Sequence, residues 1–251
     1  MAFQPDSERR KLIMSTITTI GFDADDTLWE SEIYFAEVER KFLELMQTYT
    51  VGLDAKELLY NTERNNLERF GYGVKSFTIS MVESAHHLTE GKLRSNDSMQ
   101  IIQWGKDLMR HPVELISGVQ ETLEKLDQTF SMLIITKGDL LHQRQKASSS
   151  GLMQYMNGIE VLMEKDSVSY TEILKNHRIE PDTFLMVGNS LRSDILPVLK
   201  IGGHALYVPH DLTWEHENDP GTLSALPDFT TLERIADLPE LLESFPLPRK
   251  P

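Results

Sequence analysis

Apolar and polar residues alternate along most of this chain in two kinds of pattern. Four short apolar runs, each followed by polar residues or glycine, predict buried strands at 16–25, 130–138, 183–190 and 202–209. Helical patterns at 119–126 and 170–177 precede the second and the third of these runs. Strands that alternate with helices indicate βαβ units, so we expect an α/β fold with a parallel sheet covered on both faces.

The interval from about 31 to 111 breaks this alternation, because it shows no strand pattern. Four amphipathic helical patterns follow one another there, with apolar residues that run from Phe35 to Leu45, Leu58 to Leu67, Phe77 to Leu88 and Ile101 to Leu108. Asp54 followed by Glu57 resembles a capping box that opens the second helix. We therefore expect a core made of 1–29 and 113–251, with an all-helical domain, 30–112, inserted between its two parts.

The composition is that of a soluble globular protein of one or two domains, with 251 residues of which 40% are hydrophobic and 25% charged. No run approaches the roughly 20 apolar residues that span a bilayer, so we expect no membrane partner. The net charge of −14, with no basic stripe to offset it, argues against nucleic acid as a partner. The absence of cysteine excludes disulfides and thiolate metal sites.

The segment ERRKLIMSTITTIGF has a charged and an apolar part, as secretory signals do. Its threonines, and the lack of a small-residue cleavage site before the aspartates, favour a first strand instead. We expect a cytoplasmic protein. The apolar faces of the inserted helices could bury against the core or against a second subunit, so a monomer and a homodimer both stay open.

Polar residues gather where the predicted strands end, at the edge where open parallel sheets bind ligands. They are Asp23, Asp25 and Asp26 after the first run, Thr136 and Lys137 after the second, and Asn189, Ser190 and Asp194 after the third. Asp23 and Asp25 lie two residues apart in an extended segment and so project the same way, with Asp26 turned away. Carboxylates this close repel each other, and Mg²⁺, which prefers oxygen ligands, would resolve the conflict.

Each of these residues also fits a structural role by itself. The Asp-Asp-Thr stretch could end a strand and cap a helix, and Asp194 could be an N-cap. Lys165, in the segment that leads to the helix before the third run, could be a solvated surface lysine. Their joint placement at one edge of a sheet favours a functional site.

The set resembles the motifs of the haloacid dehalogenase (HAD) superfamily of phosphohydrolases, over nearly the whole chain. Asp23-Ala24-Asp25-Asp26-Thr27 matches the first motif, Asp-x-Asp-x-Thr. Thr136 matches the second motif, Lys165 the third, and the stretch from Gly188 to Asp194 the fourth. The resemblance implies a Rossmann-like three-layer core with a parallel sheet, and it makes the helical insertion the C1 cap of this superfamily.

From this resemblance, Asp23 would be the nucleophile that forms an aspartyl-phosphate, and Asp25 would act as acid and then as base. Thr136 and Lys165 would bind the phosphoryl group. The ammonium of Lys137 could contact the phosphate or face solvent, and both readings stay open. The ligands of Mg²⁺ would be Asp23, the carbonyl of Asp25, Asn189 and Asp194.

Asp25 favours one chemistry among those of the superfamily. The resemblance implies that dehalogenases and phosphonatases lack an acid at this position, whereas the leaving alkoxide of a phosphate ester needs a proton. We therefore expect a Mg²⁺-dependent phosphatase that hydrolyses a small phosphorylated metabolite. The alternatives are a phosphotransferase or mutase that uses the same intermediate, a non-catalytic regulatory module, and a 2-haloacid dehalogenase.

Two residues depart from the family pattern. Asn189 stands where relatives usually have an aspartate that ligates Mg²⁺, which predicts weaker Mg²⁺ binding and keeps the regulatory alternative open. Lys137 stands where asparagine often follows the threonine. The segment PHDLTWEHEND at 209–219 concentrates His210, His216 and acidic residues, and for it a loop at the rim of the cleft is favoured over a second metal site.

Overall fold

The computed structural model describes residues 17–49, 54–212 and 230–244, and within them six parallel strands form one sheet in the order β3-β2-β1-β4-β5-β6. The strands are β1 (Thr19–Phe22), β2 (Ser131–Lys137), β3 (Gly158–Leu162), β4 (Phe184–Gly188), β5 (His204–Tyr207) and β6 (Thr230–Thr231). The four predicted strands are confirmed as β1, β2, β4 and β5. The sequence pattern does not predict β3, whose five residues are all half-buried, or β6, which has only two residues.

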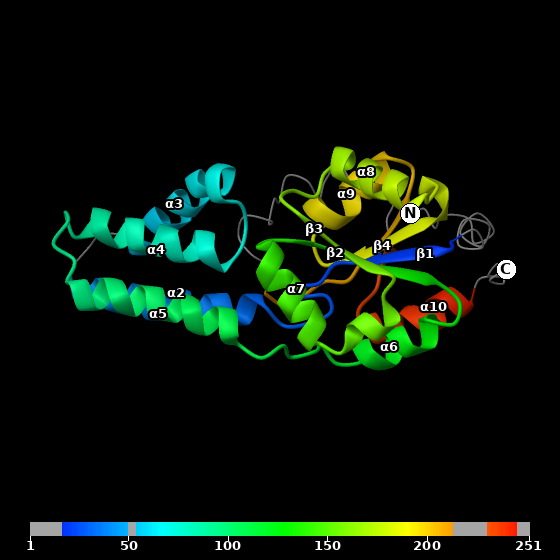
Figure 1. Ribbon diagram of the computed structural model, residues 1–251, viewed down its shortest axis with the longest axis horizontal. Helices are drawn as coiled ribbons and strands as arrows, with labels where there is room; N and C mark the ends of the chain where they lie inside the picture. The colour runs from blue at the N-terminus through cyan, green and yellow to red at the C-terminus, as the bar shows by residue number, and fades with distance from the viewer. Residues whose placement is uncertain (1–16, 50–53, 213–229, 245–251) are drawn as a thin grey trace, which may run out of the picture.

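Helices cover both faces of the sheet, which gives the expected three layers (Figure 1). One face is covered by α8 and α9, and the other by α6, α7 and α10. Their bounds are α6 (Val119–Leu126), α7 (Leu140–Ser149), α8 (Ser167–His177), α9 (Leu196–Lys200) and α10 (Leu238–Glu243). Short 3₁₀ or π turns stand at Leu152–Tyr155, Pro181–Thr183, Leu191–Ile195 and Ile235–Asp237.

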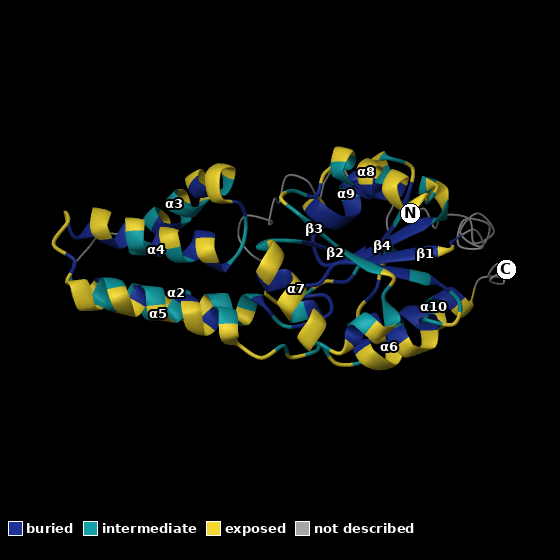
Figure 2. Ribbon diagram, in the orientation of Figure 1, coloured by how far each residue is buried: buried dark blue, intermediate teal, exposed yellow. Residues whose placement is uncertain are grey.

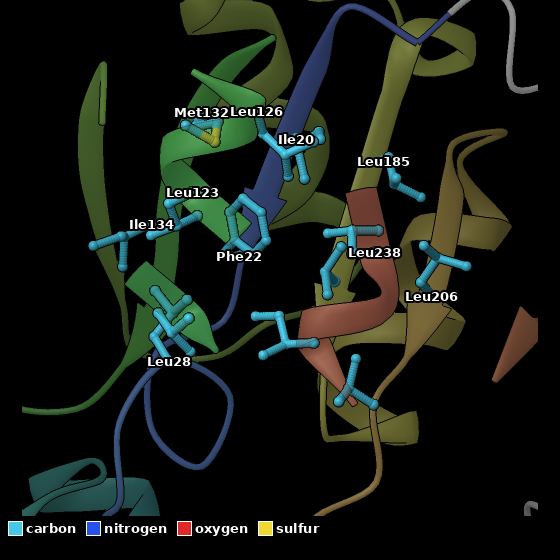
Figure 3. Packing of buried hydrophobic residues seen from close by; sticks show 14 of the residues in the cluster. Ile20, Phe22, Leu28, Leu123, Leu126, Met132, Ile134, Leu185, Leu206 and Leu238 are labelled. Atoms are coloured by element: carbon cyan, nitrogen blue, oxygen red, sulfur yellow. The ribbon is translucent and has the colours of Figure 1, made fainter. Parts of the chain in front are cut away.

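Side chains of the central strands alternate between the two faces, as the two-residue period of a strand requires. In β1, Ile20 and Phe22 point into the core that α6 and α10 cover (Figure 3). Gly21 faces the other side, where an added Cβ would lie 2.6 Å from the ring of Phe184. The close packing at the centre of the sheet therefore requires a glycine in the middle of the first strand.

Four helices follow β1 in the sequence, and in space they lie beyond one end of the sheet (Figure 1). They are α2 (Glu32–Gln47), α3 (Ala55–Phe70), α4 (Val74–Leu88) and α5 (Ser95–Arg110). They have a hydrophobic cluster of their own, in which Phe42, Met46 and Met81 are fully buried, while their outer faces are exposed (Figure 2). Of the predicted capping box, the N-cap hydrogen bond is confirmed, because the carboxylate of Asp54 accepts a hydrogen bond from the Glu57 N–H at 2.9 Å.

No helix in the part of the chain that the structure describes is both long enough and apolar enough to cross a membrane.

Candidate active site

A cavity of about 150 Å³ lies at the carboxyl ends of the central strands, between the sheet and helices α2, α3 and α4. Parallel strands bring their carboxyl ends to one edge, so residues that are distant in sequence meet there. All seven residues that the sequence analysis selected line this cavity: Asp23, Asp25, Thr136, Lys137, Lys165, Asn189 and Asp194. Side chains from the inserted helices line it as well, among them Glu32, Phe35, Glu63 and Phe77.

The centre of the site is a buried group of three charges. The ammonium of Lys165 forms ion pairs with the carboxylates of Asp23 and Asp194, at 2.7 Å in the second case. Lys165 is 3% exposed, Asp23 8% and Asp194 0%. Burial raises the pKa of Asp23 to about 8; Lys165 opposes this rise and Asp194 reinforces it. The single ammonium therefore does not balance the two carboxylates, and the site favours a further cation.

Lys165 reaches this position from the loop between β3 and α8. Asp166, the next residue, is the N-cap of α8 and closes a capping box with Ser169, which fixes the start of that helix. The backbone of Lys165 is thereby held at the sheet edge. Its side chain is buried, so the alternative of a solvated surface lysine is wrong.

Asp194 approaches the backbone of β4 closely. Its carboxylate accepts a hydrogen bond from the Ser190 N–H at 3.0 Å, and it lies in a π turn that precedes α9. A Cβ built on Gly188 would lie 2.3 Å from Oδ2 of Asp194 and 2.4 Å from its Cγ. The strand therefore ends in glycine because the carboxylate of Asp194 occupies the space of a side chain.

Gly188→Ala is expected to lower the free energy of unfolding by about 1–3 kcal/mol, because the new methyl group displaces a buried carboxylate that is held by Lys165. Chemical denaturation measures this directly. Gly158→Ala in β3 is the matched control: its Cβ would meet nothing nearer than 3.4 Å, and we expect a change below about 1 kcal/mol. Equal effects of the two substitutions would contradict this account of Gly188.

The carboxylate of Asp25 is held by three side chains that the sequence analysis did not select. It accepts hydrogen bonds from Trp29 Nε1 at 2.6 Å and from Gln143 Nε2 at 2.7 Å, and it pairs with Lys146. Burial opposes ionisation of Asp25. The charge and hydrogen bond of Lys146, together with the hydrogen bonds from Gln143 and Trp29, outweigh burial and leave the pKa of Asp25 below its ordinary value. Asp25 is thus a carboxylate at neutral pH.

Thr136 and Lys137 end β2 beside this group. Thr136 is 1% exposed, so its hydroxyl is buried at the end of β2. The ammonium of Lys137 donates to Ser193 Oγ at 2.9 Å and lies 3.6 Å from a carboxylate oxygen of Glu164 and 4.0 Å from the ring centre of Tyr72. Lys137 lines the cavity with its side chain largely covered, which disfavours the solvent-facing reading.

The oxygen donors at the strand ends fit a divalent metal. Asp23 and Asp194 offer carboxylate oxygens, and Asn189 offers an amide oxygen, to which Thr27 donates a hydrogen bond at 3.2 Å. Oxygen-only donor sets suit hard cations such as Mg²⁺. A cation bound there would lower the pKa of Asp23 and favour its ionised form.

A second acidic group lies at the rim, where Asp26, Glu30 and His210 could together hold a metal ion. Asp26 has φ +60° and accepts hydrogen bonds from the N–H groups of Ser31 and Glu32, so it caps the start of α2. His210 Nε2 lies 3.1 Å from a carboxylate oxygen of Glu30. His216 and the rest of 213–219 lie outside the described residues.

The fold and the site together define a class of protein. Residues 17–202 match the family model of the haloacid dehalogenase-like hydrolases, and the chain belongs to this family. A haloacid dehalogenase-like family hydrolase from Xanthomonas campestris is 38% identical, with 91% of each chain covered and a TM-score of 0.81. The family and the Rossmann-like α/β fold that the sequence predicts are therefore confirmed.

Two more distant relatives are named for different reactions. N-acylneuraminate-9-phosphatase from Mus musculus is 21% identical over 245 residues, which are 92% of this chain and 96% of the relative. A 2-haloacid dehalogenase from Pseudomonas syringae is 22% identical, with a TM-score of 0.60 and with 91% of this chain and 99% of the other covered. The dehalogenase shares the fold with this chain, and that likeness does not choose between the reactions.

Proposed function

We propose that the protein is a Mg²⁺-dependent phosphatase that hydrolyses a small phosphorylated metabolite through an aspartyl-phosphate on Asp23. The observation that carries this proposal is the buried group of Asp23, Lys165 and Asp194, with Asp25 held at the same cavity. The similarity to a phosphatase from mouse supports the choice of a phosphate ester as substrate.

In the first step, a carboxylate oxygen of Asp23 attacks the phosphorus atom of the ester. The bond from phosphorus to the ester oxygen breaks, and Asp25 gives that oxygen its proton. In the second step, water attacks the phosphorus atom and Asp25 takes up a proton from it. The bond from phosphorus to Asp23 breaks, which releases phosphate and restores the carboxylate.

Lys146 and Gln143 position Asp25 for these transfers. Before substrate binds, their contacts keep Asp25 ionised, which is the form that the second step needs. A phosphate ester bound beside Lys146 shares the charge of this lysine, so the pKa of Asp25 rises and Asp25 takes up a proton from solvent before the first step.

The cations of the site stabilise the charge of the transferred phosphoryl group. Lys165 stands against Asp23, and Lys137 and the buried hydroxyl of Thr136 stand at the end of the neighbouring strand. Asp23, the Asp25 carbonyl, Asn189 and Asp194 would hold Mg²⁺. The metal, when bound, supplies charge that screens the approach of one anion to another.

The test is phosphate release from a panel of phosphorylated metabolites and a generic aryl phosphate, with Mg²⁺ and with a chelator. We expect release that depends on Mg²⁺. No release from any ester, even at high Mg²⁺, would contradict the proposal. Transfer of the phosphoryl group to an added sugar or alcohol, rather than to water, would favour a phosphotransferase. Halide release from short 2-haloacids, without phosphate release, would favour a dehalogenase.

Asn189→Asp is expected to lower the Mg²⁺ concentration that gives half-maximal activity, by on the order of tenfold, because affinity for hard cations rises with the number of charged ligands. Titration of activity with Mg²⁺ measures it. Asn61→Asp, on the exposed side of α3, adds the same charge away from the cavity and is expected to change nothing. An unchanged Mg²⁺ dependence in Asn189→Asp would place residue 189 outside the metal site.

The specific observation that favours a second candidate is Asn189 itself, since the site has one carboxylate fewer than usual for the family. A non-catalytic module with a weakened metal site would bind no Mg²⁺ at millimolar levels. Binding of beryllofluoride at Asp23 would support the catalytic reading, because this ion mimics the phosphoryl group on an aspartate.

A further inference from the structure

Among the described residues, the lysines that line the cavity all lie on its core side, together with five aspartates. Its core side carries Lys137, Lys146 and Lys165, each of which pairs with a carboxylate of the core. Its cap side, formed by α2, α3 and α4, carries Glu32 and Glu63. Among the described residues, the cap contributes no lysine or arginine to the lining of this cavity.

Glu32 is one of the two acidic residues on the cap side of the cavity within the described ranges. It is the first residue of α2, is half-buried, and its carboxyl group lies among the carboxyl groups of Asp26 and Glu63. The start of a helix normally favours a carboxylate. Burial and these neighbours nevertheless raise the pKa of Glu32 to about 8. A cation bound beside Glu32 would favour the ionised form of its side chain.

The lining of the cavity also offers an acceptor oxygen and apolar surface. The side-chain oxygen Oε1 of Gln143, which is 4% exposed, accepts no hydrogen bond from the residues that the structure describes. The rings of Phe35 and Phe77 are tilted against each other with 5.3 Å between their centres, and both residues line the cavity. Acceptor oxygens, acidic side chains and aromatic rings together suit an ammonium group.

We infer that the leaving group of the substrate carries an ammonium group, so that the substrate is the phosphate monoester of an amino alcohol or amino sugar. The phosphate binds at the lysine side of the cavity, and the ammonium group binds at Glu32, with Glu63 adding to the negative field. A leaving group with a carboxylate meets repulsion at the same place. This inference rests on the proposed phosphatase function and adds the class of substrate.

Three esters that differ only at one end test the inference: 2-aminoethyl phosphate, 2-hydroxyethyl phosphate and 2-phosphoglycolate. Glucosamine 6-phosphate and glucose 6-phosphate form a second, larger pair, and a generic aryl phosphate reports phosphatase activity alone. We expect kcat/KM for the amine of at least one pair to exceed that of its hydroxyl partner by about tenfold or more. We expect 2-phosphoglycolate to be the poorest substrate of its set.

Glu32→Gln is expected to lower this amine-to-hydroxyl ratio by about tenfold, because it removes the charge and keeps the shape. Glu37→Gln is the matched control, since Glu37 lies on the exposed side of the same helix, pairs with Lys41 and does not line the cavity. It is expected to leave the ratio unchanged. If Glu32→Gln does not fold, Glu63→Gln makes the same test from α3.

Two failures are distinguishable. Release of phosphate from the aryl ester with no preference for an amine in either pair, or a preference that Glu32→Gln does not change, would overturn the inference and leave the phosphatase intact. No release of phosphate from any ester would overturn the proposed function and the inference with it.

Discussion

Asp23→Asn is expected to lower the rate of phosphate release by roughly 10⁴-fold, because an amide cannot form the aspartyl-phosphate that both steps need. Folding should be preserved, since asparagine has the same shape and burial disfavours the charge of Asp23 in any case. The Mg²⁺ dependence should disappear with the activity. Steady-state phosphate release at saturating substrate is the measurement.

The matched control for this substitution is Asp54→Asn. Asp54 caps α3 and lies outside the active-site cavity, and asparagine is also a good N-cap. It should retain the activity and the stability of the wild type. Activity of Asp23→Asn within tenfold of the wild type would exclude Asp23 as the nucleophile.

Lys165→Met is expected to lower the free energy of unfolding by about 3 kcal/mol at neutral pH and phosphate release by at least roughly a hundredfold. The substitution leaves Asp23 and Asp194 buried and facing each other without their shared cation. Stability is measured by chemical denaturation, and activity by phosphate release.

The pH dependence of this effect follows from the pKa of Lys165. Burial disfavours its charge, but Asp194 and Asp23 raise its pKa above the ordinary value. A basic group with a raised folded-state pKa stabilises the protein fully below its unfolded pKa, and this contribution is lost as the pH rises through the folded value. The deficit of Lys165→Met should therefore be present in full near pH 7, and it should shrink only as the pH rises through the raised pKa of Lys165.

Two further variants separate the loss of the ion pair from other causes. Lys165→Met combined with Asp194→Asn should recover part of the lost stability, because fewer buried charges are left without a partner. Lys200→Met, at an exposed position of α9, should change the free energy of unfolding by less than about 0.5 kcal/mol. Equal losses in Lys165→Met and Lys200→Met would contradict the role of the buried group.

The residues at the strand ends could be predicted because a parallel sheet has only one carboxyl edge. Asp23, Thr136 and Asn189 each follow a long apolar run, so the pattern alone brings them together. Lys165 is different, because the preceding strand, β3, is half-buried and shows no apolar run. Only the resemblance to the family pointed to this lysine.

The partners of Asp25 and the acidic side of the cavity could not be derived from strand ends. Gln143 and Lys146 lie on α7, which has little amphipathic pattern, yet the helix begins just after β2 and its first turns face the cavity. Glu32 stands three residues before Phe35, on the same side of α2. The available signal was an acidic residue, Glu32, in line with the apolar residues of its helix. This signal indicates a site residue only once the helix is known to face the cavity.

The central claim is that Asp23 carries the phosphoryl group during turnover. We would mix the protein with a substrate ester and Mg²⁺, stop the reaction in acid, digest the chain, and locate covalently bound phosphate by mass spectrometry. The account predicts phosphate on the peptide that contains Asp23 and none in Asp23→Asn. Phosphate on another residue, or turnover with no phosphorylated peptide at any time point, would contradict it.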